Sequence, residues 1–238
     1  YVMSLDDTLK SFLASHNPAP PHRLGQRYNR SRFLPESGNT VVCPLDLSHP
    51  SHKAVLAIRQ QLQQLPGAEA LLFTPVSSLH MTVLDGVIDS RRIPDAWPPD
   101  TPLSAPISSV TSTVSNRLSD VAPPPPINMR VSYVSPGGLA LQGATDADDA
   151  ALRHWRDALS TAFGFRHATH DTYAFHMTLA YPVDWIPDSL AALWQQTLET
   201  MTKRLTIQTP VIPLAPPEFC IFNDMTHFEP VRALARPA

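Results

Sequence analysis

One short motif occurs twice in this chain, about half a chain apart. His80-Met81-Thr82-Val83 follows Leu79, and His176-Met177-Thr178-Leu179 follows Phe175. Because strand side chains alternate between two faces, the His and Thr of each copy point to one face and the apolar residues to the other. An internal duplication places equivalent strands in equivalent positions, so the repeat predicts two similar lobes, each with one such strand.

Each copy of the repeat presents one imidazole beside one hydroxyl. A single copy is more often a strand with a satisfied His on its polar face, but the second copy favours a shared role. An imidazole with a pKa near ~6.5 can take up a proton and return it. Two copies that meet across a cleft therefore predict a paired acid and base, His80 and His176, flanked by two hydrogen-bond donors, Thr82 and Thr178.

The two His-x-Thr motifs resemble those of the two-histidine (2H) phosphoesterase superfamily, whose members include cyclic phosphodiesterases and RNA ligase-type proteins. The flanking sequences are similar to its cyclic-phosphodiesterase-like branch, and the similarity covers most of residues 22–235. The segments that carry it are Gly25–Tyr28, Phe33–Pro35, Gly38–Cys43, Asp171–His176 and Leu179–Tyr181.

The resemblance implies hydrolysis of a cyclic phosphodiester. One His would remove a proton from the attacking water, and the other would protonate the departing ribose oxygen, while both Thr hydroxyls bind the phosphate. The expected substrate is a 2′,3′-cyclic nucleotide, an ADP-ribose cyclic phosphate or an RNA end. Which His begins as the base stays open. We expect no metal and no other cofactor, because catalytic zinc sites usually need three protein ligands.

Residues 17–38 form a Pro-rich arm that carries several Arg in a mildly acidic chain. The arm is either a solvated segment or a rim that brings guanidinium groups to a phosphate. The resemblance around Arg27 and Tyr28 favours the second interpretation, so both residues are expected to bind the substrate.

Two strand residues are further candidates for substrate binding. The family pattern favours Tyr173, although strict alternation turns it away from the face of His176 unless the strand starts late or bulges. Arg130 lies within a predicted strand, where a charge needs a partner, so it either binds phosphate in the cleft or pairs with a carboxylate. Asp85 and Asp171 lie near the motifs and either orient an imidazole or cap a turn.

The order of predicted elements indicates an α+β fold: two pseudo-symmetric lobes of mainly antiparallel sheet, with outer helices around a central cleft. Residues 1–38 are expected to hold an N-terminal helix and the arm, and residues 39–238 a single bilobal catalytic domain with its lobe boundary near 123–126. Helices are predicted over 4–16, 51–65, 106–119, 146–163 and 188–204, and strands over 39–47, 69–73, 79–87, 127–134, 139–142, 172–181, 211–214, 219–222 and 228–234.

Composition limits the partners. A net charge of −3 does not favour binding to long nucleic acids, so the expected partner is a small phosphorylated substrate or an RNA terminus. Cys43 and Cys220 have no ligand spacing and are predicted to be buried free thiols, which fits a cytoplasmic protein. No stretch approaches the ~20 apolar residues of a membrane span, and we expect a monomer.

Two other functions remain open. The cleft could bind a nucleotide or RNA end without turnover, although both motifs are intact. The same His pair could also act on a non-phosphate small molecule. That alternative predicts an apolar cleft with few Arg, whereas a phosphoesterase needs at least one Arg or Lys near the phosphate.

Overall fold

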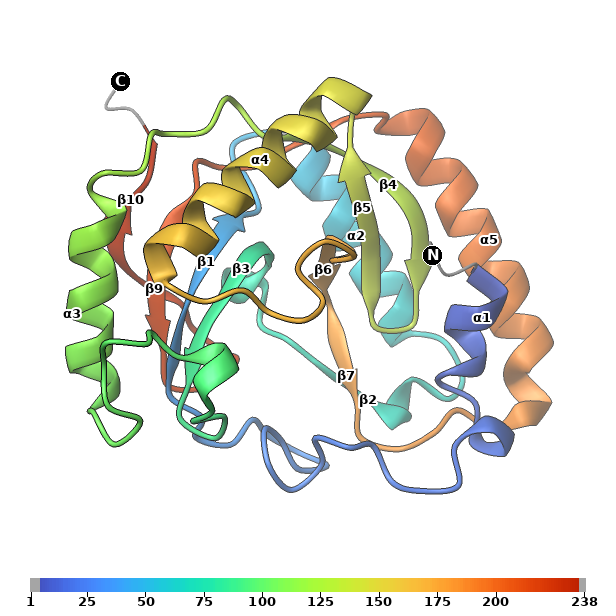
Figure 1. Cartoon of the computed structure of the whole chain (residues 1–238). Helices are drawn as coiled ribbons and strands as arrows, with labels where there is room; N and C mark the ends of the chain where they lie inside the picture. Colours follow the sequence, from blue (N-terminus) through green and yellow to red (C-terminus); the bar gives the residue numbers. More distant parts are fainter. Residues whose placement is uncertain (1–4, 236–238) are drawn as a thin grey trace.

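The computed structural model describes residues 5–235, which form one curled eight-stranded sheet, a two-stranded sheet and outer helices (Figure 1). The large sheet has the order β10-β9-β1-β3-β6-β5-β4-β8, and its paired strands run antiparallel. Its strands are β1 Gly38–Pro44, β3 His80–Ile88, β4 Asn128–Ser135, β5 Gly138–Gly143, β6 His176–Thr178, β8 Ile212–Pro213, β9 Glu218–Phe222 and β10 Glu229–Ala233. The small sheet pairs β2 Leu71–Phe73 with β7 Ala180–Pro182.

The α+β fold predicted from the sequence is confirmed. Each half of the large sheet contributes one motif strand, and the two motif strands, β3 and β6, are neighbours at its centre. The helices lie around the sheet: α4 packs on β3 and β5, α5 on β4, and α3 on α4 (Figure 1). Their bounds are α1 Leu5–Lys10, α2 Ser51–Gln63, α3 Ile107–Leu118, α4 Asp146–Phe163 and α5 Ala191–Gln208.

Helix α4 shows how local sequence sets an element. Thr145 accepts a hydrogen bond from the Asp148 amide while Asp148 accepts one from the Thr145 amide, a reciprocal cap that starts the helix. Gly164, with φ of 82°, ends it in the left-handed region that glycine adopts without strain. The predicted range 146–163 is therefore confirmed.

The second motif strand is shorter than predicted. The sequence predicts one strand over 172–181, but β6 covers only His176–Thr178, and after Leu179 the chain joins the other sheet as β7. A close approach to the 138 turn holds β6 in place: a Cβ at Gly138 would lie 2.1 Å from the Met177 carbonyl oxygen. Only glycine allows the hairpin β4–β5 to approach this closely.

The N-terminal helix is also shorter than predicted. It ends at Lys10, and residue 4 of the predicted range lies outside the described residues. Leu9 and Leu13 are nonetheless buried in the main core. The boundary near 123–126 and the division at residue 38 stay predictions. Pro230 fits its strand, because β10 is the edge of the sheet, where a missing N–H costs no ladder hydrogen bond.

Among the helices within residues 5–235, none has the length and apolar character needed to cross a membrane.

Candidate active site

The two motifs lie side by side on one face of the sheet. Met81 pairs with Met177 in an antiparallel ladder, so His80 lies opposite Thr178 and Thr82 lies opposite His176. Both Met side chains are fully buried, which leaves the His and Thr on the other face. Cross-strand neighbours lie roughly 5 Å apart and diagonal ones roughly 7–8 Å. The sheet thus forms a four-residue array with the two His on one diagonal and the two Thr on the other.

Both imidazoles are held in the same way. Nδ1 of His80 lies 2.7 Å from the Ser78 carbonyl oxygen, and Nδ1 of His176 lies 2.9 Å from the Ala174 carbonyl oxygen. A carbonyl can only accept, so Nδ1 carries the proton in each ring and Nε2 is left to exchange one. Each contact runs to the residue two positions earlier. Backbone carbonyls, not Asp85 or Asp171, therefore orient the rings; Asp171 is exposed and pairs with Arg166.

His80 lies in the less polar of the two environments. Its ring packs against Phe228, with centroids 4.2 Å apart, on the loop between β9 and β10. The pKa of His80 is lowered to about 4: burial is the main cause and nearby His176 adds to it, while the Ser78 carbonyl and Asp85 act in the opposite direction. His80 is therefore neutral at physiological pH in the free protein.

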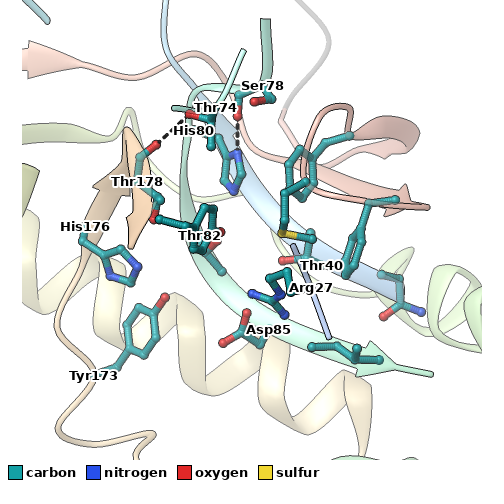
Figure 2. Close-up of a pocket in the computed structure, with 16 residues that line it drawn as sticks. Arg27, Thr40, Thr74, Ser78, His80, Thr82, Asp85, Tyr173, His176 and Thr178 are labelled. Carbon is teal, nitrogen blue, oxygen red and sulfur yellow. Dashed lines mark hydrogen bonds between the residues drawn. The ribbon is translucent and has the colours of Figure 1, made fainter. Parts of the chain in front are cut away.

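His176 is exposed, and its nearest aromatic neighbour is Tyr173, with ring centroids 6.0 Å apart. Tyr173 reaches the same face because β6 begins at His176, which is the late start that the sequence left open. Figure 2 shows the Tyr173 hydroxyl directed towards the space beside His176. Burial raises the pKa of this phenol, so it stays a neutral hydrogen-bond donor.

A cavity of about 220 Å³ covers the array (Figure 2). His80, Thr82, His176 and Thr178 all line it. Within residues 5–235, the side-chain hydroxyls of Thr82 and Thr178 have no hydrogen-bond partner, so both can donate to a bound oxygen. Thr74 instead bonds to the backbone carbonyls of Thr178 and Leu179 and ties the neighbouring loop to β6.

Among the described residues, Arg27 is the Arg or Lys that lines this cavity, and its positive charge is largely balanced by the carboxylate of Glu36. Its Nε lies 2.5 Å from Glu36, a carboxylate only 5% exposed. Burial lowers the pKa of Arg27, but Tyr181 and Glu36 outweigh that effect and raise it. Tyr28 does not line the cavity: it is buried, with its ring centroid 5.3 Å from that of Tyr181. Asp85 also lines the cavity.

Arg130 lies outside the cavity. Its side chain is exposed on β4, and its guanidinium faces the Gln142 amide oxygen on β5 at 2.6 and 2.8 Å. The structure therefore supports neither role that the sequence suggested for Arg130: it does not line the cavity, and it forms no ion pair with a described carboxylate. Within the described part of the chain, no three His, Cys, Asp or Glu side chains are grouped as metal ligands.

Sequence reasoning missed part of the wall. Phe222, Met225 and Phe228 form an apolar side of the cavity, although the strand pattern favours core positions for such residues. Asn39 and Thr40 of β1 also line it. No local motif marks these residues, because they reach the cavity through contacts between distant segments: β1 pairs directly with β3, and Phe228 of the β9–β10 loop packs against His80.

Comparisons with known proteins agree with this picture. Residues 27–140 match a family model described as "2H-phosphodiest: Domain of unknown function (DUF1868)". A solved structure of a conserved protein of unknown function from Agrobacterium tumefaciens str. C58 is similar, with 42% identity and a TM-score of 0.93 over 98% of this chain and all of that one. A second solved structure, described as a phosphoesterase, has 10% identity and a TM-score of 0.48 over 85% of this chain and all of that one, which is too distant to support an argument. No curated protein matches the chain.

Proposed function

Because the chain belongs to the two-histidine phosphoesterase superfamily, we propose that it hydrolyses a cyclic phosphodiester without a metal. The expected substrate is a 2′,3′-cyclic nucleotide, an ADP-ribose cyclic phosphate or an RNA end. The observation that supports the proposal most is the array on β3 and β6. Two imidazoles lie on one diagonal and two hydroxyls on the other, and within residues 5–235 neither Nε2 nor either hydroxyl has a hydrogen-bond partner.

His80 is the general base in this proposal, because its lowered pKa leaves it neutral and able to accept a proton. Nε2 of His80 takes a proton from water as the water oxygen bonds to phosphorus. The phosphorus–ribose oxygen bond breaks, and protonated Nε2 of His176 gives its proton to that oxygen. Thr82 and Thr178 donate to the non-bridging oxygens, where negative charge accumulates. The bound phosphate raises the lowered pKa of His80 towards neutrality, where proton transfer is most effective.

The charge of the cavity disfavours a dianionic group more than a monoanionic one. Arg27 is matched by Glu36, and Asp85 adds one negative charge at the wall. A cyclic phosphodiester carries one negative charge, whereas the monoester product carries nearly two at pH 7, so the product is held less well than the substrate.

A second candidate is a reaction of the same His pair on a non-phosphate small molecule. The apolar wall of Phe222, Met225 and Phe228 and the matched charge of Arg27 favour it. A cleft that only binds a nucleotide or RNA end is a weaker alternative, because both His keep a free Nε2.

Phosphorus NMR tests the proposal. The protein is incubated with EDTA and a panel of 2′,3′-cyclic nucleotides and ADP-ribose cyclic phosphate, beside His80→Ala and His176→Ala. The cyclic phosphate resonance is expected to convert to a monoester resonance with the native protein and to persist with both variants. Absence of turnover of every substrate by folded protein would favour the two alternatives.

A further inference from the structure

A second cavity adjoins the candidate active site. Its volume is about 280 Å³, and it lies between β3, α4 and the loop that precedes β6. Asp85 and Tyr173 line both cavities and form the wall between them. Arg91, Arg156 and His167 line the second cavity alone. The two cavities therefore differ in charge. In the first, the charge of Arg27 is balanced by Glu36, whereas the second is lined by the guanidiniums of Arg91 and Arg156.

Arg156 of α4 is 2% exposed, which is unusual for a charged side chain. Its Nη1 donates to the Val83 carbonyl of the motif strand, and its guanidinium lies 4.1 Å from the centroid of the Tyr173 ring. Its Nε is buried and has no hydrogen-bond partner within residues 5–235. The edge formed by Nε and Nη2, with which Arg binds phosphate through two parallel hydrogen bonds, is thus unused.

Arg91 also has a donor without a partner, but its Nε/Nη2 edge is half used. Its Nη2 lies 3.0 Å from the Gly86 carbonyl oxygen, and its Nε is buried without a partner within the same residues. Burial lowers the pKa of both guanidiniums, and both remain charged because Arg titrates far above neutral pH.

No carboxylate of the described chain lies within 4.0 Å of a guanidinium nitrogen of Arg91 or Arg156. Two carboxylates line the cavity: Asp85 acts on both Arg from a longer distance, and Asp95 is exposed. Arg27 and Arg166, by contrast, have direct carboxylate partners. A buried cation, Arg156, and a half-buried one, Arg91, both with unused donors, need an anion to compensate them.

We propose that this second cavity binds a further phosphate group of the substrate, held by Arg91 and Arg156 while the scissile cyclic phosphate lies on the His–Thr array. The inference rests on the proposed function and narrows its substrate class to molecules with a second phosphate, such as a 5′-phosphorylated cyclic nucleotide or a diphosphate-linked one. His167 and Thr169 supply additional polar groups at the same cavity.

A binding experiment tests the cavity without turnover. Inorganic pyrophosphate is titrated by calorimetry into the native protein, Arg91→Gln, the double variant His80→Gln/His176→Gln, and Lys203→Gln. Lys203 is exposed on α5 and controls for the loss of one positive charge. Binding is expected to weaken about tenfold or more in Arg91→Gln alone, because a hydrogen bond to a charged group contributes ~1.5–3 kcal/mol. Unchanged binding in Arg91→Gln, or loss in the His double variant alone, overturns the proposal.

A kinetic experiment tests the substrate. Adenosine 2′,3′-cyclic phosphate is compared with the same nucleotide carrying a 5′-phosphate. Arg91→Gln is expected to raise KM about tenfold for the 5′-phosphorylated substrate and to leave the other unchanged. Equal effects on both substrates overturn the proposal, because a structural role predicts that result. If neither substrate is hydrolysed, the proposed function fails, while the pyrophosphate titration still shows whether the second cavity binds phosphate.

Arg156→Lys serves as a second variant that keeps the buried charge but loses the bidentate edge.

Discussion

The two motif copies share a tetrapeptide and a backbone contact, but they occupy different environments. The copy on β3 lies in a nine-residue strand, and His80 packs under Phe228. The copy on β6 lies in a three-residue strand, and His176 is exposed beside Tyr173. The lesson is that a duplicated sequence supplies two equal groups, while the surrounding fold makes them unequal. An acid–base pair requires that inequality, because one member must begin neutral and the other protonated.

The largest expected effect tests whether the two His have different roles. We expect His80→Gln and His176→Gln each to lower kcat by about 10²–10⁴-fold, because each removes one proton-transfer step. The pH profile of kcat/KM, measured on the residual activity, distinguishes the roles of the two His. The fall in kcat/KM at acid pH is assigned to protonation of His80. It is expected to persist in His176→Gln and to disappear in His80→Gln. The reverse pattern would exchange the roles of base and acid.

The second prediction tests whether the two Thr have the same role. Each hydroxyl lies opposite the His of the other copy, so both are expected to bind the non-bridging oxygens equally. Thr82→Val and Thr178→Val are each expected to lower kcat by about 100-fold, the cost of one donor to a developing charge. Thr→Ser at the same positions keeps the donor and is the matched control. A higher KM with an unchanged kcat would instead mean that the hydroxyls bind the substrate without stabilising the transition state.

Phe228 tests the origin of the asymmetry. Phe228→Ala admits water to the His80 ring, so the pKa of His80 is expected to rise from about 4 towards the usual ~6.5. The measurement is the imidazole titration followed by NMR. Val231→Ala, on the neighbouring edge strand and 43% exposed, is the control that should leave the titration unchanged. An unmoved His80 titration would mean that other buried groups set its pKa.

The smallest expected effect concerns stability. The pKa of His80 is lower in the folded state than in the unfolded chain, so between about pH 6.5 and 4 the unfolded chain binds the extra proton. The free energy of unfolding is therefore expected to fall as the pH drops through this range, and the part due to His80 is about 1–2 kcal/mol after allowance for the ring's partial exposure. Urea denaturation at several pH values measures it. His80→Gln should flatten this slope, whereas the same slope in both proteins would contradict the burial argument.

Much of the fold follows from local sequence. The range of α4 was predictable because Thr145, Asp148 and Gly164 supply a cap at each end. The 172–181 prediction was wrong because the apolar pattern of Phe175, Met177 and Leu179 continues through a point where the chain changes sheets. That change depends on the pairing of β7 with β2, which no local residue specifies.

The same division applies to the candidate site. The sequence indicated that Arg130, a charge within a strand, needs either a phosphate or a carboxylate as its partner. In the structure its guanidinium faces the neutral amide of Gln142 on the neighbouring strand. Arg91 and Arg156 carried no sequence signal, yet both line the second cavity, Arg156 buried and Arg91 half-buried. A charge is informative only with its burial and its neighbours, and both depend on contacts between residues far apart in the chain.

The sequence by itself determined the four residues of the array and the face they share, because strand alternation is a local property with a period of two. It also determined the family through the two motifs. Only the tertiary structure decided that β3 and β6 are antiparallel neighbours, that Phe228 buries His80 and that His176 stays exposed. Register and burial arise from the packing of distant segments, and two nearly identical tetrapeptides therefore acquire different surroundings only when the chain is folded.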